Sequence, residues 1–219
     1  DIEEGEKVAL VGPSGGGKST IVKLLYRHYD PTLGNVMVDG KNLKDYDFHE
    51  YRRFLSIVPQ EVDVFNGTVF DNIAYGMEKV KQEDVFKAAE IAHAHEFIHD
   101  FKTGYKTEVG ERGVKLSGGQ RQRIGIARAV LRNPSLLVFD GATSNLDSHS
   151  EKMIQQALNE VSQKQTMLII AHRLSTIQLC DKIVVIEKGK IVEIGTHQEL
   201  QANKGLYSYL LELQQAGEL

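Results

Sequence analysis

The sequence predicts an α/β fold in which a mostly parallel sheet is covered by helices on both faces. Short apolar segments alternate along the chain with stretches of helical periodicity, and this is the pattern of buried parallel strands joined by helices. Residues 68–101 interrupt the alternation, because they are rich in Ala, Glu, Lys and His at helical spacing. We therefore expect a helical subdomain inserted between two halves of the sheet.

The first half of the chain begins with the apolar run Lys7–Val11, which a glycine ends and which predicts a buried strand. Residues 21, 24, 25 and 28 keep helical spacing, so a helix is expected from about Lys18 to just before residue 30. Alternating apolar residues between glycines predict a strand at 34–40, and a short apolar run ended by proline predicts another at 55–58.

The α/β pattern returns after residue 117. Ile124, Ala127 and Leu131 fall on one face of a predicted helix, which precedes a fully apolar strand. The last two strands are joined by Lys188-Gly189, a tight-turn signal. The remaining predictions are strands at 136–139, 167–171, 183–186 and 190–194, and helices at about 148–161, near 198 and at 207–213.

The length, charge and cysteine content exclude several classes of protein. The 219 residues suffice for one large domain or two small ones with a real core. A net charge of -4 argues against a nucleic-acid protein held by bulk electrostatics. The single cysteine, Cys180, excludes an intrachain disulfide framework and a thiolate metal cluster. No apolar run approaches the roughly 18 residues that span a bilayer, and the start at Asp1 is interpreted as that of a fragment of a longer protein.

A glycine-rich segment after the first strand matches the pattern Gly-x-x-x-x-Gly-Lys-Ser/Thr and leads into a helix, the context that a phosphate-binding P-loop requires. Glycines let backbone N–H groups close around phosphate oxygens at a helix N-terminus. Lys18 supplies a charge to the β- and γ-phosphates, and the Ser19 hydroxyl can ligate Mg²⁺. The predicted nucleotide-binding residues are Gly12, Pro13, Ser14, Gly15, Gly16, Gly17, Lys18, Ser19 and Thr20.

Asp140 offers the acidic partner of this loop. It ends the apolar strand at 136–139, downstream of the glycine-rich segment, where a carboxylate can hold Mg²⁺ through its water shell. An apolar strand that ends in Asp is common by itself, but beside a phosphate-binding loop it becomes specific. Together, the two motifs predict a protein that binds ATP with Mg²⁺.

The segment Ser117, Gly118, Gly119 and Gln120 forms a second anion site, because a hydroxyl and two glycine N–H groups stand at the start of a helix. It resembles the signature motif of ABC-family ATPases, and residues 121–123 resemble the usual continuation. The resemblance implies a P-loop NTPase (RecA-like) core at about 1–60 and 117–219 with a helical subdomain at about 61–116. It also implies a head-to-tail dimer in which each signature clasps the partner's ATP.

The resemblance extends over nearly the whole chain and assigns further roles. Gln60 resembles the Q-loop glutamine that touches Mg²⁺ and the attacking water and faces the membrane domain. Asp147 ends a segment similar to the D-loop, with Asn145 where Ala is more usual, and His172 resembles the switch histidine that contacts the γ-phosphate. Residues 106–113 are similar to the x-loop of exporters, and 65–69 and 71–76 resemble exporter segments as well.

Gly141 departs from the family pattern, which places a Glu directly after the strand-end Asp to polarise the attacking water. Glycine cannot act as a base, and loss of a general base typically costs about 10²–10⁴-fold in rate. We therefore expect ATP binding without efficient hydrolysis. A natural degenerate site of a heterodimeric exporter and an engineered substitution that traps the ATP state both account for such a change.

A second departure concerns the N-terminal side of the phosphate loop. Only eleven residues precede Gly12 and none is aromatic, whereas the family carries an adenine-stacking aromatic residue further upstream. The first strands of the family's small β-subdomain are also missing, so we expect a truncated β-subdomain. Loss of base stacking, worth about 1–3 kcal/mol on nucleic-acid platforms, would weaken ATP binding.

The resemblance implies the ATP-hydrolysing motor domain of an ABC exporter at the cytoplasmic face of a membrane. The expected partners are a second ABC domain, identical or different, and a transmembrane domain on the same or another chain, with no nucleic acid. A soluble, non-transport ABC ATPase remains an alternative. A non-hydrolysing, ATP-dependent dimerisation module is another, and Gly141 is the feature that favours it.

Overall fold

The computed structural model describes residues 1–111, 113–141, 147–162, 165–171 and 173–216. Its strands are β1 (Lys7–Val11), β2 (Met37–Val38), β3 (Lys41–Asn42), β4 (Leu55–Val58), β5 (Gly67–Thr68), β6 (Glu108–Val109), β7 (Leu136–Asp140), β8 (Thr166–Ile170), β9 (Lys182–Glu187) and β10 (Lys190–Gly195). Its α-helices are α1 (Lys18–Leu25), α2 (Phe48–Arg53), α3 (Val69–Ile73), α4 (Gln82–Ile91), α5 (His95–His99), α6 (Gly118–Leu131), α7 (Ser148–Ser162), α8 (Leu174–Ile177), α9 (His197–Ala202) and α10 (Leu206–Ala216), with 3₁₀ turns η1 (Leu43–Asp45) and η2 (Gly104–Lys106).

A six-stranded sheet forms the centre, in the order β10-β9-β1-β8-β7-β4. All its neighbouring strands pair in parallel except β10, which turns back antiparallel on β9. The order places β1 between strands that come more than a hundred residues later in the chain. The α/β fold with a mostly parallel sheet, predicted from the apolar runs, is confirmed.

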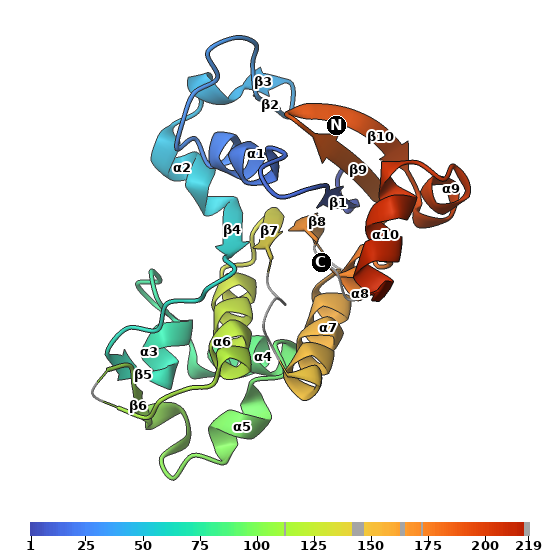
Figure 1. The fold of residues 1–219 in the computed structure, drawn as a ribbon. Helices are drawn as coiled ribbons and strands as arrows, with labels where there is room; N and C mark the ends of the chain where they lie inside the picture. Colours follow the sequence, from blue (N-terminus) through green and yellow to red (C-terminus); the bar gives the residue numbers. More distant parts are fainter. Residues whose placement is uncertain (112, 142–146, 163–164, 172, 217–219) are drawn as a thin grey trace.

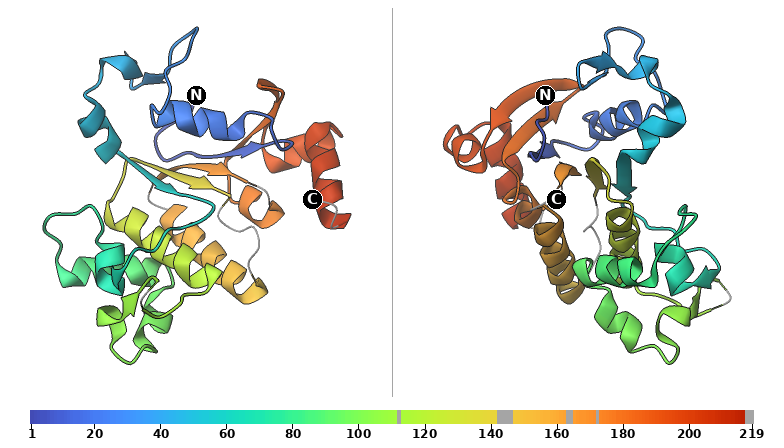
Figure 2. Two further views of the ribbon diagram at one scale, coloured as in Figure 1. Left: turned by 60° about the vertical axis from the view of Figure 1, so that its left-hand side comes forward. Right: turned by 180° about the vertical axis from the view of Figure 1, so that it is seen from behind.

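Successive residues of the strands face opposite sides of the sheet and pack against different helices. Val8 and Leu10 of β1 join Val22 of α1 in one apolar cluster. Ala9 and Val11 point the other way, into the larger cluster that includes residues of α4, α6, α7 and α10. Figures 1 and 2 show α1 on one side of the sheet and α6 and α7 on the other. Burial on both faces explains why the strand sequences are continuously apolar.

The middle of the chain, from α3 to α5, packs on the outer side of α6, as the lower part of Figure 1 shows. Its two ends meet in the short antiparallel pair of β5 and β6, which brings Gly67 opposite Val109. The helices predicted within residues 68–101 are present, although they are three short segments, with His93 at a φ of +50° between α4 and α5.

The strand predicted at 34–40 was too long. Only Met37–Val38 is extended and paired, and it turns back on Lys41–Asn42. Asp39 and Gly40 connect them with φ of +48° and +73°, the two positive angles of a type I′ hairpin turn. The Asp-Gly pair is the strongest local hairpin signal, so this turn ends the strand earlier than alternation alone suggests.

In the described part of the chain, no helix combines the length and apolar character that crossing a membrane requires.

Candidate phosphate-binding and signature sites

The parallel strands bring the ends of separate motifs to one edge of the sheet. Leu10 of β1 pairs with Ile170 of β8, and Ile170 pairs in turn with Asp140 of β7. Strand β4 runs parallel to β7, so Gln60 follows at this same edge. The carboxyl ends of parallel strands are where α/β proteins bind ligands. Gly12, Gln60 and Asp140 therefore lie around one region although they are far apart in sequence.

The glycine-rich loop between β1 and α1 is held by backbone contacts to the β9–β10 hairpin. Gly12 has a φ of +148°, and a Cβ there would overlap the carbonyl oxygen of Ile186. Gly189 donates its N–H to the Gly16 carbonyl at 2.8 Å. Gly17, at a φ of +109°, leads into α1 without any side chain to cap it. The first turn of α1 therefore has no side-chain cap, and an anion can bind its N–H groups instead.

Lys18 is buried inside this loop, with 6% of its surface exposed. Its Nζ donates to the carbonyl oxygens of Gly12 at 2.7 Å and Pro13 at 2.9 Å. Burial lowers the pKa of Lys18, and the nearby Asp140 carboxylate acts in the opposite direction. The loop thus surrounds a cation, whereas Ser14, Gly15, Ser19 and Thr20 lie at its exposed surface.

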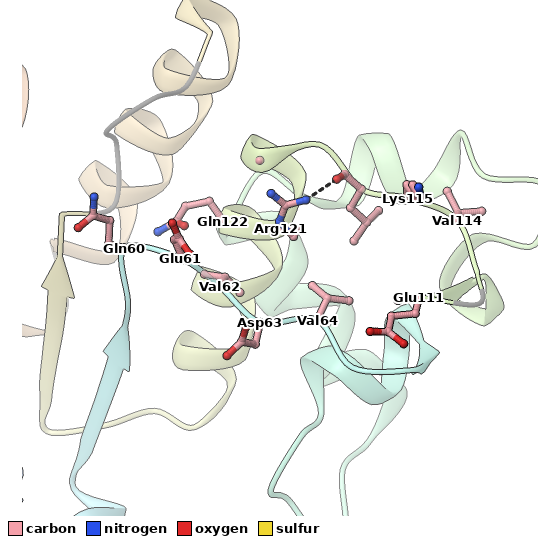
Figure 3. Close-up of a pocket in the computed structure, with 13 residues that line it drawn as sticks. Gln60, Glu61, Val62, Asp63, Val64, Glu111, Val114, Lys115, Arg121 and Gln122 are labelled. Carbon is pink, nitrogen blue, oxygen red and sulfur yellow. Dashed lines mark hydrogen bonds between the residues drawn. The ribbon is translucent and has the colours of Figure 1, made fainter.

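Gln60, Asp140 and Ser19 bring oxygen donors to the same edge. A Cβ at Gly141 would lie 3.4 Å from Gln60 Oε1, so the Gln60 side chain reaches the end of β7 (Figure 3). The Asp140 carboxylate is near enough to Lys18 to favour its charged form, so it lies close to the glycine-rich loop. Hydroxyl, amide and carboxylate oxygens are the donors that Mg²⁺ takes, usually alongside water and phosphate. The residues present therefore fit a Mg-nucleotide.

Gly141 adopts a conformation that favours glycine. Its φ is +61°, and its N–H donates to the Ile170 carbonyl at 3.2 Å, which continues the contact between β7 and β8. Glycine therefore brings no side-chain group for catalysis to this position, and it adopts the positive φ without strain. His172 and the segment 142–146, including Asn145, lie outside the described residues.

Ser117 caps α6 through a reciprocal pair of hydrogen bonds. Its Oγ accepts from the Gln120 N–H at 3.2 Å, and Gln120 Oε1 accepts from the Ser117 N–H at 2.9 Å. This capping box uses both side chains of the predicted signature, and Ser-x-x-Gln is a sequence signal for it. Gly118 is the first residue of α6, and it also lines the groove described below.

Gly119 marks a close approach of two helices that the sequence did not reveal. A Cβ at this position would overlap the Ser150 side chain of α7, so the first turns of α6 and α7 touch. Asp147 caps α7, and its Oδ1 accepts from the N–H groups of His149 at 3.1 Å and Ser150 at 2.9 Å. Hydrogen bonds from the Ser150 side chain and backbone lower the pKa of Asp147.

An ion pair between Arg173 and Glu151 joins the segment after β8 to the same helix α7. Neither residue was singled out from the sequence. Their partnership spans two elements, and only proximity in the fold shows it.

A groove of about 650 Å³ opens between the segment after β4 and the segment that leads into α6. Figure 3 shows Gln60 at one end of it and Glu111 at the other. Sequence reasoning identified its two walls as separate motifs without predicting that they face each other. The groove is lined by Gln60, Glu61, Val62, Asp63, Val64, Gly110, Glu111, Val114, Lys115, Leu116, Gly118, Arg121 and Gln122.

Comparisons with known proteins agree on one family. The family model described as ABC transporter matches residues 1–144. The chain is 53% identical over 213 residues to proteins of Staphylococcus aureus strains NCTC 8325 and COL that are named multidrug export ATP-binding/permease proteins. The matches cover 97% of this chain and 37% of those proteins.

The fold comparison gives the same result. A bacterial Atm1-family ABC exporter with ATP bound superposes with a TM-score of 0.90 at 44% identity, over 97% of this chain and 37% of the exporter chain. The chain thus spans little more than a third of the length of the relatives it matches.

Proposed function

This chain belongs to the ABC transporter family, and we propose that it is the ATP-binding and hydrolysing domain of an exporter. Its relatives named above combine ATP-binding and permease parts, and the similar solved structure is an exporter with ATP bound. The chain matches that structure at a TM-score of 0.90 over 97% of its length. We assign the core to about residues 1–60 and 117–219 and the helical subdomain to about 61–116.

The observation that carries a head-to-tail dimer is the placement of the two anion-binding helix ends. Helix α1, which follows the phosphate loop, packs on one face of the sheet, and α6, which follows Ser117, packs on the other (Figure 1). From this packing on opposite faces we infer that the two helix N-termini serve different triphosphates. A second copy, or a related domain, brings its own signature to the first chain's nucleotide.

The proposed roles follow from position and chemistry. The N–H groups of the glycine-rich loop and Lys18 hold the phosphates. When bound, Mg²⁺ would neutralise phosphate charge, and Ser19, Gln60 and Asp140 are the residues that would hold it. Gln60 also orients the attacking water. Ser117 to Gln120, with Asp147, meet the partner's nucleotide. The role proposed for His172, contact with the γ-phosphate, rests on the family resemblance alone.

The groove beside Gln60 suits the permease part of the transporter. One end of the groove lies at the nucleotide edge of the sheet, and the other lies at the x-loop-like segment. A segment docked there would touch both motifs at once, so that closure of the dimer pulls on it. We accordingly place the domain at the cytoplasmic face of a membrane.

Gly141 favours a second candidate function, that of an ATP-dependent dimerisation module with little or no turnover. Glycine has no side chain, so this residue cannot polarise the attacking water. Binding and dimerisation do not need that carboxylate, so both candidates share the same fold and sites. Turnover measurements separate them, and membrane spans in the adjoining sequence would separate both from a non-transport ABC ATPase.

The proposal is tested by ATP binding and particle mass. Titration calorimetry measures ATP affinity in Mg²⁺, and light scattering measures mass with and without Mg-ATP. We expect the chain to bind ATP and to double its mass, and Lys18→Met to do neither. Lys23→Met removes an exposed lysine of the same helix and should behave as the original chain. A chain that binds no ATP contradicts the proposal, and one that binds ATP but stays monomeric contradicts the dimer.

A further inference from the structure

Helix α6 holds the segment that carries Gln60. The buried Gln122, 3% exposed, donates its Nε2–H to the Pro59 carbonyl at 3.2 Å. That carbonyl belongs to the residue directly before Gln60, so the bond sets the peptide from which the Gln60 side chain departs. Figure 3 shows Gln122 on α6 beside this segment.

Two further contacts hold the far side of the same segment. A Cβ at Gly125 would lie 2.6 Å from Val62 Cγ2, so only glycine lets Val62 pack this closely on the helix. Arg128 donates from Nη2 to the Asp63 carbonyl at 3.1 Å. Its Nε donates to the Asn72 carbonyl of α3 at 2.8 Å, so one guanidinium ties the segment to the helical subdomain as well.

The three α6 residues form a stripe, defined as Gln122, Gly125 and Arg128. They stand three residues apart, and this spacing keeps them on one face of a helix. The contacts they make fall on residues 59, 62 and 63, which bracket Gln60 and Glu61. The two hydrogen bonds go to backbone carbonyls, so they fix the path of the segment rather than its side chains.

We propose that Gln122 and Arg128 are positioning residues that hold Gln60 in reach of the Mg-nucleotide. The inference rests on the proposed function, since it assumes that Gln60 acts on the metal of a bound nucleotide. Because α6 begins at the signature, the same helix presents Ser117 to the partner's ATP and holds Gln60 against the chain's own. In this proposal, a shift of α6 on dimer closure also moves Gln60. Nucleotide binding at one site of the dimer is thereby coupled to the position of Gln60 at the other.

The test measures how much Mg²⁺ strengthens ATP binding. Calorimetry gives the ATP dissociation constant in Mg²⁺ and in EDTA for each variant, and their ratio is the metal effect. Gln122→Met keeps the side-chain volume and removes the donor. Arg128→Lys keeps the charge and cannot span both carbonyls, so it serves as a second variant should the first fail to fold. Gln156→Met makes the same exchange at a half-buried position on α7 and is the matched control.

We expect Gln122→Met and Arg128→Lys to reduce the metal effect about tenfold, a typical loss when a residue that orients a metal ligand is removed. ATP affinity in EDTA should stay within about twofold, and Gln156→Met should change neither value. Gln60→Ala should reduce the metal effect similarly. The double variant Gln60→Ala with Gln122→Met should lose no more than Gln60→Ala alone, because both act through one contact.

Other outcomes overturn the inference. A metal effect that is unchanged in both stripe variants shows that Gln60 does not depend on α6. Losses that multiply in the double variant show that Gln122 acts elsewhere, and equal losses in Mg²⁺ and EDTA show a general structural role. If the unaltered chain binds no ATP, the proposed function fails; if it binds ATP with a metal effect that the variants keep, only this inference fails.

Discussion

Gly141 lets the catalytic and structural contributions of one position be measured separately. Replacing it with Glu restores the carboxylate that the family pattern has and places a side chain on a residue with a φ of +61°. The left-handed conformation costs about 1–2 kcal/mol for a residue with a Cβ. Among the described residues, the three atoms nearest to the added Cβ belong to the Gln60 side chain, at 3.4 Å or more, so little steric cost is added. We expect Gly141→Glu to lower the free energy of unfolding by about 1–2 kcal/mol.

The expected gain in catalysis is larger than this cost. A general base typically contributes about 10²–10⁴-fold, which corresponds to roughly 3–5 kcal/mol of barrier. Steady-state phosphate release with Mg-ATP should therefore rise by at least about a hundredfold in Gly141→Glu. Urea unfolding, followed by circular dichroism, gives the stability of the same preparations.

Two further substitutions at the position serve as controls. Gly141→Ala and Gly141→Gln carry the same backbone strain, and Gln has the shape of Glu without its charge. Both should lose the same stability as Gly141→Glu, and neither should gain turnover. The reasoning is refuted if Gln hydrolyses ATP as fast as Glu, or if Glu, folded and dimeric, is as slow as Gly.

Two more predictions concern the contact between α6 and α7. Gly119→Ala should destabilise the fold by up to about 2 kcal/mol, because overpacking against Ser150 costs about 1–3 kcal/mol and the better helix propensity of Ala offsets about 1 kcal/mol. In urea unfolding, adding Ser150→Gly should make the pair less destabilised than the sum of the single changes; strict additivity would contradict the contact. Ser150→Ala should raise the pKa of Asp147 toward the ordinary value of about 3.9, because it removes the side-chain hydrogen bond that lowers it. The stability that Asp147 adds is present above the ordinary carboxyl pKa and is lost as pH falls through the lowered one. Carboxyl NMR titration measures this pKa, and an unchanged value in Ser150→Ala would show that the backbone N–H groups alone set it.

The elements that sequence reasoning identified are those whose signal is local. The run Lys7–Val11 is apolar at every position but its first because both faces of β1 are covered, so its burial is visible without any knowledge of its neighbours. The phosphate loop is a continuous motif between a strand and a helix. Where a local signal was passed over, the error was also local: the Asp39-Gly40 turn shortens the strand expected at 34–40.

The site is less visible in the sequence because its parts come from separated segments. Asp147 was expected at a dimer contact, and in the described chain its carboxylate caps α7 through the N–H groups of residues 149 and 150. Ser117 was expected to meet a phosphate, and its Oγ accepts the Gln120 N–H. Capping does not exclude the proposed roles, since both residues stay at helix N-termini where anions bind.

By itself, the sequence determined that this chain is an α/β protein, and it predicted a phosphate-binding loop, a signature segment and a glycine at the position of the usual catalytic Glu. Each of these features depends on residues that are close together in the sequence. Only the tertiary structure decided that Gln60 reaches Gly141 and that Gln122 holds the Pro59 peptide, a contact across 63 residues. Such contacts depend on strand order and on how closely helices approach, and no short stretch of sequence contains that information.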